Sequence, residues 1–145
     1  MNNSKKYAMF VGRWQPLHKG HMWLINQKLD KNIPVLICVR DIAPDISNPL
    51  TTQQTVEILE AAYKDHEVVV QVIPDVESVN YGRGVGYSVE EHKPPSNIEV
   101  VSATEIRNRI LNKDDSWKEY VHPSVSHLVQ KYLVKQLDGL LKKAA

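Results

Sequence analysis

Three short apolar runs alternate with two segments of helical periodicity in the first half of the chain. The apolar runs are Tyr7–Val11, Pro34–Arg40 and Val68–Ile73, and the helical segments between them are about His18–Asp30 and Thr51–Lys64. Apolar runs without polar alternation are typical of parallel strands that are covered on both faces. In such a sheet, the helix that connects two parallel strands forms a right-handed crossover. The alternation therefore predicts an α/β fold, a doubly wound parallel sheet with helices on both faces.

The second half of the chain is less regular, but it ends in a clear amphipathic helix. Apolar residues recur at helical spacing from Val125 to about Leu141. A shorter helix is expected from Thr104 to about Lys113, and Val85–Glu90 is a candidate for a short strand. The length of 145 residues suits one domain with a real core and is too short for two comfortable domains. We therefore expect a single domain over residues 1–145, with residues 1–6 disordered.

The charge balance and the cysteine usage narrow the classes of function. The net charge is +1, so no global attraction favours nucleic acid or an anionic membrane, and any phosphate must be bound by a local site. The one cysteine, Cys38, lies in an apolar run and has no second cysteine for an internal disulfide, which favours a reduced, cytoplasmic setting. No apolar run approaches the length that spans a membrane.

The strongest chemical signal lies at the corner between the first strand and the first helix, over Gly12–His21. Helix N-termini at such corners bind phosphates, because free backbone N–H groups and the positive end of the helix dipole point at them. His18 and His21 can donate hydrogen bonds to the oxygens of an α-phosphate, and Gly20 lets the backbone approach closely. The alternative interpretation is that both histidines only cap the helix and remain exposed.

A second pattern suited to anion binding follows far downstream. Ser102–Arg107 has the spacing Ser-x-Thr-x-x-Arg and opens the predicted helix. Thr104 can cap this helix and offer its hydroxyl and the following N–H groups to a phosphate. Arg107 lies about one turn further on, so its guanidinium can reach the same anion with two-pronged geometry. The alternative is an ordinary Ser/Thr helix cap with a solvated arginine.

Together, the two motifs resemble those of the nucleotidyltransferase superfamily that carries a His-x-Gly-His motif and a later Ser-x-Thr-x-x-Arg motif. The lead-in Gly12-Arg13-Trp14-Gln15-Pro16 is most similar to the nicotinamide-nucleotide adenylyltransferase branch, because cytidylyltransferases more often carry an acidic residue at the position of Gln15. Asn48-Pro49-Leu50-Thr51 resembles the segment that opens the second helix in archaeal members of that branch. The resemblance extends from Tyr7 to about Leu133 and implies a Rossmann-like fold.

The resemblance also implies a reaction and a set of site residues. A phosphate oxygen of a small acceptor, such as nicotinamide mononucleotide, attacks the α-phosphorus of ATP, and pyrophosphate leaves. Mg²⁺ or a similar divalent cation bridges the phosphates and needs few protein ligands. Because members of the superfamily often self-associate, a homo-oligomer is one expectation. The implied catalytic residues are His18, His21 and Arg107. The implied nucleotide-binding residues are Gly12, Arg13, Trp14, Gln15, Gly20, Arg40, Ser102 and Thr104.

The acceptor half of the site departs from that branch. The stretch between Asp75 and Ser102 is much shorter and lacks the usual acceptor-binding tryptophan segment. A glycine-rich loop stands in its place and carries three side chains that can contact a base or an acceptor: Tyr81, Arg83 and Tyr87. Two alternatives stay open. One is a cytidylyltransferase that uses CTP and a phosphorylated alcohol such as glycerol 3-phosphate, and the other is a nucleotide-binding domain without catalytic activity.

Overall fold

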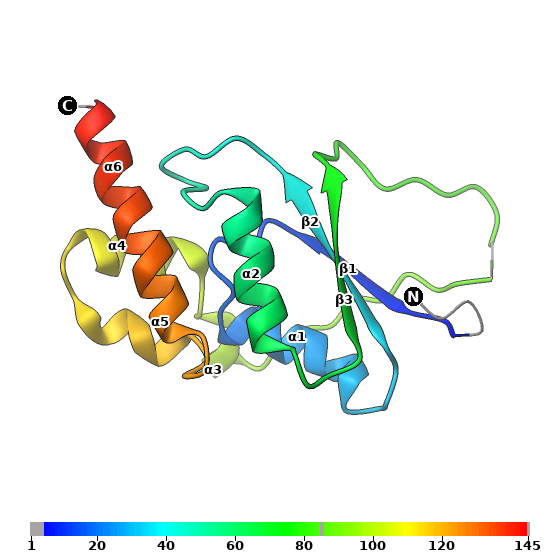
Figure 1. The fold of residues 1–145 in the computed structure, drawn as a ribbon. Coiled ribbons are helices and arrows are strands. Elements are labelled where there is room, and N and C mark those ends of the chain that lie inside the picture. Colours follow the sequence, from blue (N-terminus) through cyan, green and yellow to red (C-terminus); the bar gives the residue numbers. More distant parts are fainter. Residues whose placement is uncertain (1–4, 85, 145) are drawn as a thin grey trace.

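The computed structural model describes residues 5–84 and 86–144, and within them the chain has an α/β fold (Figure 1). A parallel three-stranded sheet is flanked by helices, as the alternating pattern predicts. In chain order, the elements are β1 (Ala8–Gly12), α1 (Lys19–Leu29), β2 (Val35–Asp41), α2 (Thr52–Ala62), β3 (Val68–Pro74), α3 (Ser96–Glu99), α4 (Ala103–Leu111), α5 (Ser126–Val129) and α6 (Lys135–Ala144). A 3₁₀ helix (Asp115–Tyr120) follows α4, and a π-helical segment (Gln130–Val134) joins α5 to α6.

The strands lie side by side in the order β1–β2–β3, and both pairings are parallel. Phe10 lies opposite Ile37, and Ile37 lies opposite Val70. All three strands therefore end at the same edge of the sheet, at Gly12, Asp41 and Pro74. This carboxyl edge is where parallel α/β sheets bind their ligands.

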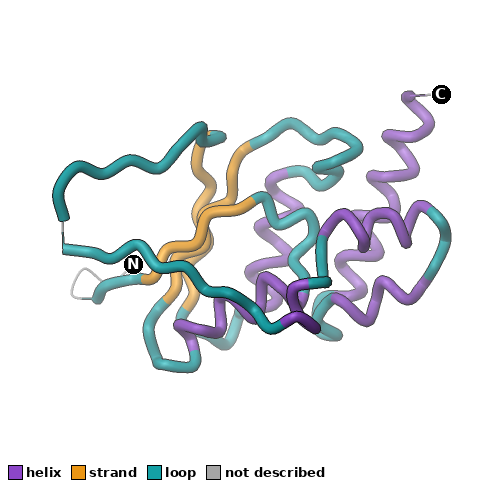
Figure 2. The backbone as a smooth tube through the Cα atoms, turned by 180° about the vertical axis from the view of Figure 1, so that it is seen from behind, coloured by secondary structure: helices purple, strands orange, loops and turns teal. Residues whose placement is uncertain are grey.

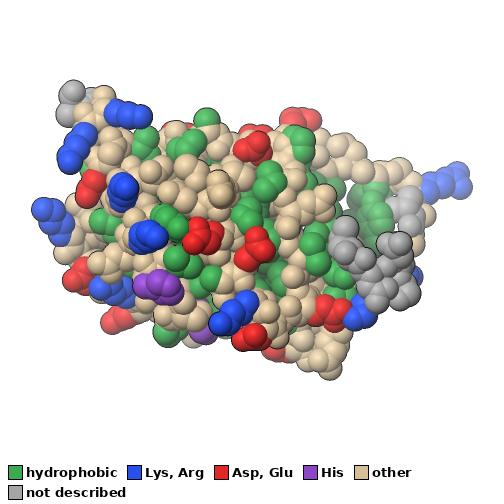
Figure 3. Space-filling view, viewed as in Figure 1, with side chains coloured by type: hydrophobic (Ala, Val, Ile, Leu, Met, Phe, Trp, Pro, Cys, Tyr) green, Lys and Arg blue, Asp and Glu red, His purple; other side chains and the backbone are tan. Residues whose placement is uncertain are grey.

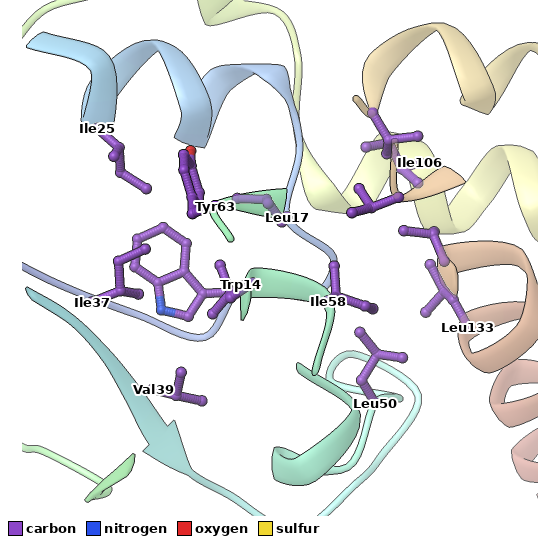
Figure 4. Packing of buried hydrophobic residues seen from close by; sticks show 14 of the residues in the cluster. Trp14, Leu17, Ile25, Ile37, Val39, Leu50, Ile58, Tyr63, Ile106 and Leu133 are labelled. Carbon is purple, nitrogen blue, oxygen red and sulfur yellow. The ribbon is translucent and has the colours of Figure 1, made fainter. Parts of the chain in front are cut away.

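The hydrophobic core lies on one face of this sheet. Ile37 and Val39 of β2 are fully buried in one apolar cluster with Ile25 of α1 and Ile58 of α2 (Figure 4). The connection from β1 to β2 and the connection from β2 to β3 step in the same direction across the sheet. Because both connections are right-handed, their helices α1 and α2 lie on the same face. On the opposite face, Met9 of β1 is 57% exposed.

The helices begin close to the predicted positions because their caps are local. Oγ1 of Thr51 accepts a hydrogen bond from the N–H of Gln54 (3.1 Å), and Oε1 of Gln54 accepts one from the N–H of Thr51 (3.0 Å). This reciprocal capping box satisfies two N–H groups at the start of α2. Helices α1 and α4 also begin within one residue of their expected starts.

The predicted C-terminal helix is confirmed as a continuous helical run over residues 126–144, with one π-helical turn inside it. Its buried residues recur at a spacing of four, at Val125, Val129, Leu133 and Leu137. An α-helix has 3.6 residues per turn, so a spacing of four drifts around its surface, and the wider π-helical turn counteracts this drift. The run packs beside the loop before α2, where Nε2 of Gln136 donates to the carbonyl of Pro49 (3.0 Å).

The segment between β3 and α3 differs from the sequence-based expectation. The candidate strand Val85–Glu90 is wrong, because residues 86–90 form no strand; residue 85 lies outside the described residues. Gly86 has a φ of 88°, a left-handed conformation that interrupts an extended run. The segment swings away from the end of β3 and returns to α3 (Figure 2). On the way, Glu90 forms an ion pair with Lys28 of α1 (2.7 Å).

The N-terminal residues and the surface charge can be compared with the sequence-based expectations. The expected disorder of residues 1–6 stays a prediction: residues 1–4 lie outside the described part, and Lys5 forms an ion pair with Glu67. Acidic and basic side chains are interspersed over the face shown in Figure 3, in keeping with the small net charge. No helix in the described ranges is both long enough and apolar enough to cross a membrane.

Because Leu133 is fully buried in the apolar cluster, we expect Leu133→Ala to lower the free energy of unfolding by about 2–5 kcal/mol. Leu141, which is 44% exposed in α6, provides the matched control, and Leu141→Ala should cost less than about 1 kcal/mol. Urea denaturation followed by circular dichroism measures both changes. Equal losses for the two variants would contradict the assignment of Leu133 to the core.

Candidate functional site

The first motif forms the N-terminal cap of α1. Nδ1 of His18 accepts hydrogen bonds from the N–H groups of Gly20 (3.0 Å) and His21 (3.3 Å). In return, Nδ1 of His21 accepts from the N–H of His18 (3.3 Å). The pair is therefore a capping box built from two histidines, and the two rings stack with their centroids 3.7 Å apart. Capping, one of the two roles considered for these residues, is confirmed.

The caps define the protonation state of both rings. A ring nitrogen that accepts a hydrogen bond carries no proton, so in each neutral imidazole the proton sits on Nε2. Burial lowers the pKa of His18 to about 4, and burial together with the neighbouring His18 lowers the pKa of His21 to about 3. Both rings are thus neutral at pH 7, and each keeps an Nε2–H group that the cap does not use. His18 is 6% exposed, so the interpretation of both histidines as exposed caps is wrong for it.

The glycine between the histidines is required by the ring of His18. A Cβ atom at Gly20 would lie 2.8 Å from Cε1 of His18 and 3.4 Å from the carbonyl oxygen of Val101. Any side chain at this position would push the capping imidazole away from the helix N-terminus. The close approach seen at Gly20 is to the His18 ring, and the predicted approach of its backbone to a phosphate stays a prediction. Gly20 also brings α1 against Val101, the residue directly before the second motif.

Trp14 supports the motif from inside the protein. It has a φ of 55°, a left-handed conformation that is unusual and costly for a bulky residue. Its indole is 3% exposed, donates from Nε1 to the carbonyl of Cys38 (3.1 Å), and meets His21 edge-on with ring centroids 4.8 Å apart. A Cβ at Gly12 would lie 2.9 Å from this indole. Gly12 therefore makes room for the Trp14 indole, and this indole packs against the ring of His21.

The second motif opens α4 with a serine cap. Oγ of Ser102 accepts from the N–H of Glu105 (3.1 Å), so the capping residue is Ser102, and the expectation of a Thr104 cap is wrong. Oγ1 of Thr104 instead accepts a hydrogen bond from Nη2 of Arg107 (3.3 Å). The reason is positional: the capping side chain must sit just outside the helix, and Thr104 is already inside its first turn.

The two motifs meet in space. Nη1 of Arg107 donates to the main-chain carbonyl of Gln15 (2.9 Å) across 92 residues of sequence. Burial lowers the pKa of the Arg107 guanidinium, and the nearby carboxylate of Asp45 opposes that shift. An arginine side chain remains charged in proteins. The N-terminus of α1, the N-terminus of α4 and one half-buried cation therefore lie together, and this combination suits a polyphosphate.

The side chain of Gln15 is turned into the protein. The residue is 4% exposed. Its Nε2 donates to the carbonyl of Leu50 (3.2 Å), and its Oε1 accepts from the N–H of Leu50 (2.8 Å). Sequence reasoning groups Gln15 with the nucleotide-binding residues and misses this contact, because a bond from a side chain to a distant main chain leaves no pattern in the sequence.

The two other predicted cations, Arg40 and Arg13, have different surroundings. Arg40 forms an ion pair with Asp75 (2.6 Å) and also donates to the carbonyl of Val76 (2.9 Å), so its guanidinium secures the segment that follows β3. Arg13 lines a polar hollow at the carboxyl edge of the sheet. The hollow is lined by Arg13, Asp41, Ile42, Ala43, Asp45, Asn48 and Asp75.

Asp45 is a site residue that sequence reasoning missed. A hydrogen bond from the backbone N–H of Asn48 is the largest cause that lowers the pKa of its carboxyl, and the charge of Arg13 adds to the effect. Asp45 also acts electrostatically on Arg107. The Asp45–Asn48 turn is polar in sequence, but its electrostatic contact with Arg13 and Arg107 depends on the fold.

The three side chains proposed for the base or the acceptor are exposed. Tyr81, Arg83 and Tyr87 lie in the segment that swings away from β3 (Figure 2). In the described part of the chain, none of these three side chains takes part in the hydrogen bond that joins the two motifs. Within residues 5–84 and 86–144, no group of three or more His, Cys, Asp or Glu side chains could hold a metal ion.

The fold and the two adjoining motifs are those expected of an α/β nucleotidyltransferase with a His-x-Gly-His motif. A scan against protein-family models found no match. Curated relatives nevertheless confirm the resemblance seen in the sequence. The chain is 26% identical to the nicotinamide-nucleotide adenylyltransferase of Methanococcus aeolicus, over 91% of this chain and 90% of the relative. It is also 26% identical to the enzyme of that name from Thermococcus kodakarensis, over 86% and 82% of the two chains.

Solved structures agree on the fold. A bifunctional NMN adenylyltransferase/ADP ribose pyrophosphatase from Francisella tularensis, complexed with AMP and a manganese ion, matches with a TM-score of 0.64 and 18% identity. A second structure of that bifunctional protein matches with a TM-score of 0.63 and 21% identity. The matches cover 97% of this chain but only 53% and 54% of those chains, so this chain spans about half their length.

The histidine caps predict a pH dependence of stability. An unfolded histidine titrates near pH 6.5, whereas burial lowers the pKa of folded His18 to about 4. Between these values the unfolded chain binds a proton that the folded chain does not, so the free energy of unfolding should fall as the pH is lowered from about 7 to about 4. The slope is at most about 1.4 kcal/mol per pH unit for each such histidine.

His18→Asn isolates this contribution, because asparagine keeps a capping acceptor but does not titrate. Chemical denaturation at pH 7 and at pH 4.5 should show a smaller pH-dependent loss in the variant than in the wild type. Carboxyl groups that titrate in this range are common to both proteins and cancel in the comparison. Identical losses would show that His18 is not held neutral by the fold.

Proposed function

We propose that this protein is an adenylyltransferase that transfers AMP from ATP to a small phosphorylated acceptor, nicotinamide mononucleotide or a close analogue, and releases pyrophosphate. The observation that carries the proposal is the contact between Arg107 and the carbonyl of Gln15, since it joins the two phosphate-binding motifs into one site. The names of the curated relatives support the choice of adenylyl transfer and of the acceptor. We also propose that residues 1–145 act as a single domain.

The arrangement accounts for the chemistry without a general base. A phosphate oxygen of the acceptor is already ionised, attacks the α-phosphorus, and forms a new O–P bond while the bond to the β-phosphate oxygen breaks. Catalysis then requires positioning and stabilisation of the charge on the α-phosphoryl oxygens. The Nε2–H group of His18 supplies this stabilisation as a neutral donor, and the Nε2–H group of His21 holds the triphosphate.

The second motif holds the departing phosphates. The cap by Ser102 leaves N–H groups at the start of α4, beside Thr104, and Arg107 supplies the charge that stays on the protein throughout the reaction. The donors gathered at this centre are N–H groups and a guanidinium, which suit anions and not cations. ATP is therefore proposed to enter as its complex with Mg²⁺ or a similar divalent cation, which neutralises phosphate charge and is held mainly by the phosphates.

Some expectations remain predictions. Contact of the nucleotide with Gly12, Arg13, Trp14 or Gln15 is one of these predictions; the side chains of Trp14 and Gln15 are buried. Contacts of Tyr81, Arg83 and Tyr87 with an acceptor, self-association and a cytoplasmic setting are likewise predictions. The acceptor is proposed from the names of the curated relatives, since the segment between β3 and α3 differs from the branch that the chain resembles.

The test is a measurement of pyrophosphate release with defined pairs of substrates. ATP with nicotinamide mononucleotide should give sustained release in the presence of Mg²⁺, and CTP with glycerol 3-phosphate should give at most a small fraction of that rate. The reverse preference would identify a cytidylyltransferase. Binding of ATP by calorimetry without pyrophosphate release for either pair would contradict the enzymatic proposal and favour a nucleotide-binding domain.

A substitution at His18 tests its role in the transition state. We expect His18→Ala to lower turnover by about 10²-fold or more, as when a single preorganised donor to the transition state is removed. His127 is exposed at the start of the C-terminal helical run, so His127→Ala is the matched control and should keep wild-type turnover. Steady-state pyrophosphate release measures both. Wild-type turnover in His18→Ala would exclude the catalytic role.

A further inference from the structure

The side chain of Gln15 forms a two-pronged contact with one residue of a distant loop. Its amide nitrogen donates to the Leu50 carbonyl, and its amide oxygen accepts from the Leu50 N–H, as a neighbouring β-strand would. The residue is almost completely buried. Both polar atoms of the side chain are therefore committed to the main chain of Leu50, and burial makes each of these bonds costly to lose.

The main chain of Gln15 holds the second motif. Its carbonyl accepts the hydrogen bond from Nη1 of Arg107, while Nη2 of the same guanidinium is held by Thr104. The direction of that carbonyl depends on how the backbone of residue 15 is fixed. The side-chain contact with Leu50 fixes it, because a residue that is bonded at both amide atoms cannot rotate freely in its loop.

Leu50 is itself a firm anchor. The next residue, Thr51, caps α2, and the preceding residue, Pro49, receives a hydrogen bond from Gln136 of the C-terminal helical run. The backbone on both sides of Leu50 is therefore fixed by other elements. The side chain of Gln15 therefore links the loop after β1 to this fixed segment before α2.

We propose that Gln15 is a positioning residue that sets the guanidinium of Arg107 for the triphosphate and does not itself bind the nucleotide. The inference rests on the proposed function for the ligand, but its physical content is the coupling between Gln15 and Arg107. Direct contact of the Gln15 side chain with the nucleotide, which the family resemblance implies, is the competing outcome of the tests.

A double-mutant cycle separates the two outcomes. Arg107→Ala should weaken ATP binding by about tenfold or more, because a charged donor to phosphate is lost. Gln15→Ala should weaken it by a smaller factor, about three- to tenfold, and the double variant should match Arg107→Ala within about twofold, because one residue acts through the other. Isothermal calorimetry with Mg²⁺ and ATP measures all four proteins. Multiplicative losses in the double variant would overturn the proposal and show that Gln15 contacts the nucleotide independently.

A conservative variant provides a pH profile that a general loss of stability would not produce. In Gln15→Glu, a protonated carboxyl can restore both bonds to Leu50, whereas the carboxylate would face the Leu50 carbonyl without a proton to donate. Burial raises the pKa of such a carboxyl. The ratio of the ATP dissociation constants of the variant and the wild type should therefore be near one at about pH 5 and should rise at higher pH. A ratio that does not depend on pH would contradict the proposal.

The matched control removes a bond of the same kind from the same loop. Gln136→Ala deletes the hydrogen bond to the Pro49 carbonyl and leaves the contact between Gln15 and Leu50 in place. Because the Thr51 cap still fixes the backbone next to Leu50, the variant should keep ATP affinity within about twofold of the wild type. A loss as large as that of Gln15→Ala would attribute the effect to general loosening of the loop and would overturn the proposal.

A measurement without nucleotide keeps the inference separate from the proposed function. The ¹⁵Nε signal of the Arg107 side chain should show a rigid guanidinium in the wild type and in Gln136→Ala, and a mobile one in Gln15→Ala. If the wild type binds no ATP, the proposed function fails while this readout still decides the coupling. An Arg107 side chain that is equally ordered in all three proteins would overturn the inference, whatever the enzyme assay gives.

Discussion

The hydrogen bond from Arg107 to the main-chain carbonyl of Gln15 is the contact on which the site depends. It joins the loop after β1 to the first turns of α4, so it exists only when the strands, the crossovers and α4 are all in place. A second contact runs beside it, where the missing side chain of Gly20 lets α1 approach the carbonyl of Val101. One helix N-terminus offers donors from one side only, whereas two adjoining N-termini offer them from two sides of a polyphosphate.

The imidazole of His18 caps a helix and, in the proposed mechanism, also donates a hydrogen bond to the substrate. Serine or aspartate would cap α1 equally well, but neither would leave an N–H donor on its far side. Because Nδ1 is used by the helix, the proton is held on Nε2, and burial keeps the ring neutral. Gly20 is needed because the ring covers the backbone of the first turn. The spacing of the motif therefore follows from the geometry of the cap, before any phosphate is considered.

Local signals account for what the sequence predicts well. Apolar runs define the three strands, and Thr51 with Gln54 forms a cap that can be recognised within four residues. Contacts that depend on strand order leave no such signal: Arg40 meets Asp75 because β2 and β3 end side by side. The left-handed conformation of Trp14 is equally hidden, since nothing in its neighbours demands it. The pairing of the two motifs was predictable only through the resemblance to a known family.

A resemblance shows that a residue is present, but not which way it points. Within the lead-in to the first motif, the side chains of Trp14 and Gln15 turn into the protein, and Gly12 makes room for the indole. The side chains of Trp14 and Gln15 therefore hold the loop itself. Under the proposed function, the donors to the nucleotide are the two Nε2–H groups, the start of α4 and Arg107. Along the carboxyl edge, Asp45 balances part of the positive charge of Arg13 and Arg107. A ligand bound at this edge would therefore meet a surface of mixed charge and not a uniformly basic one.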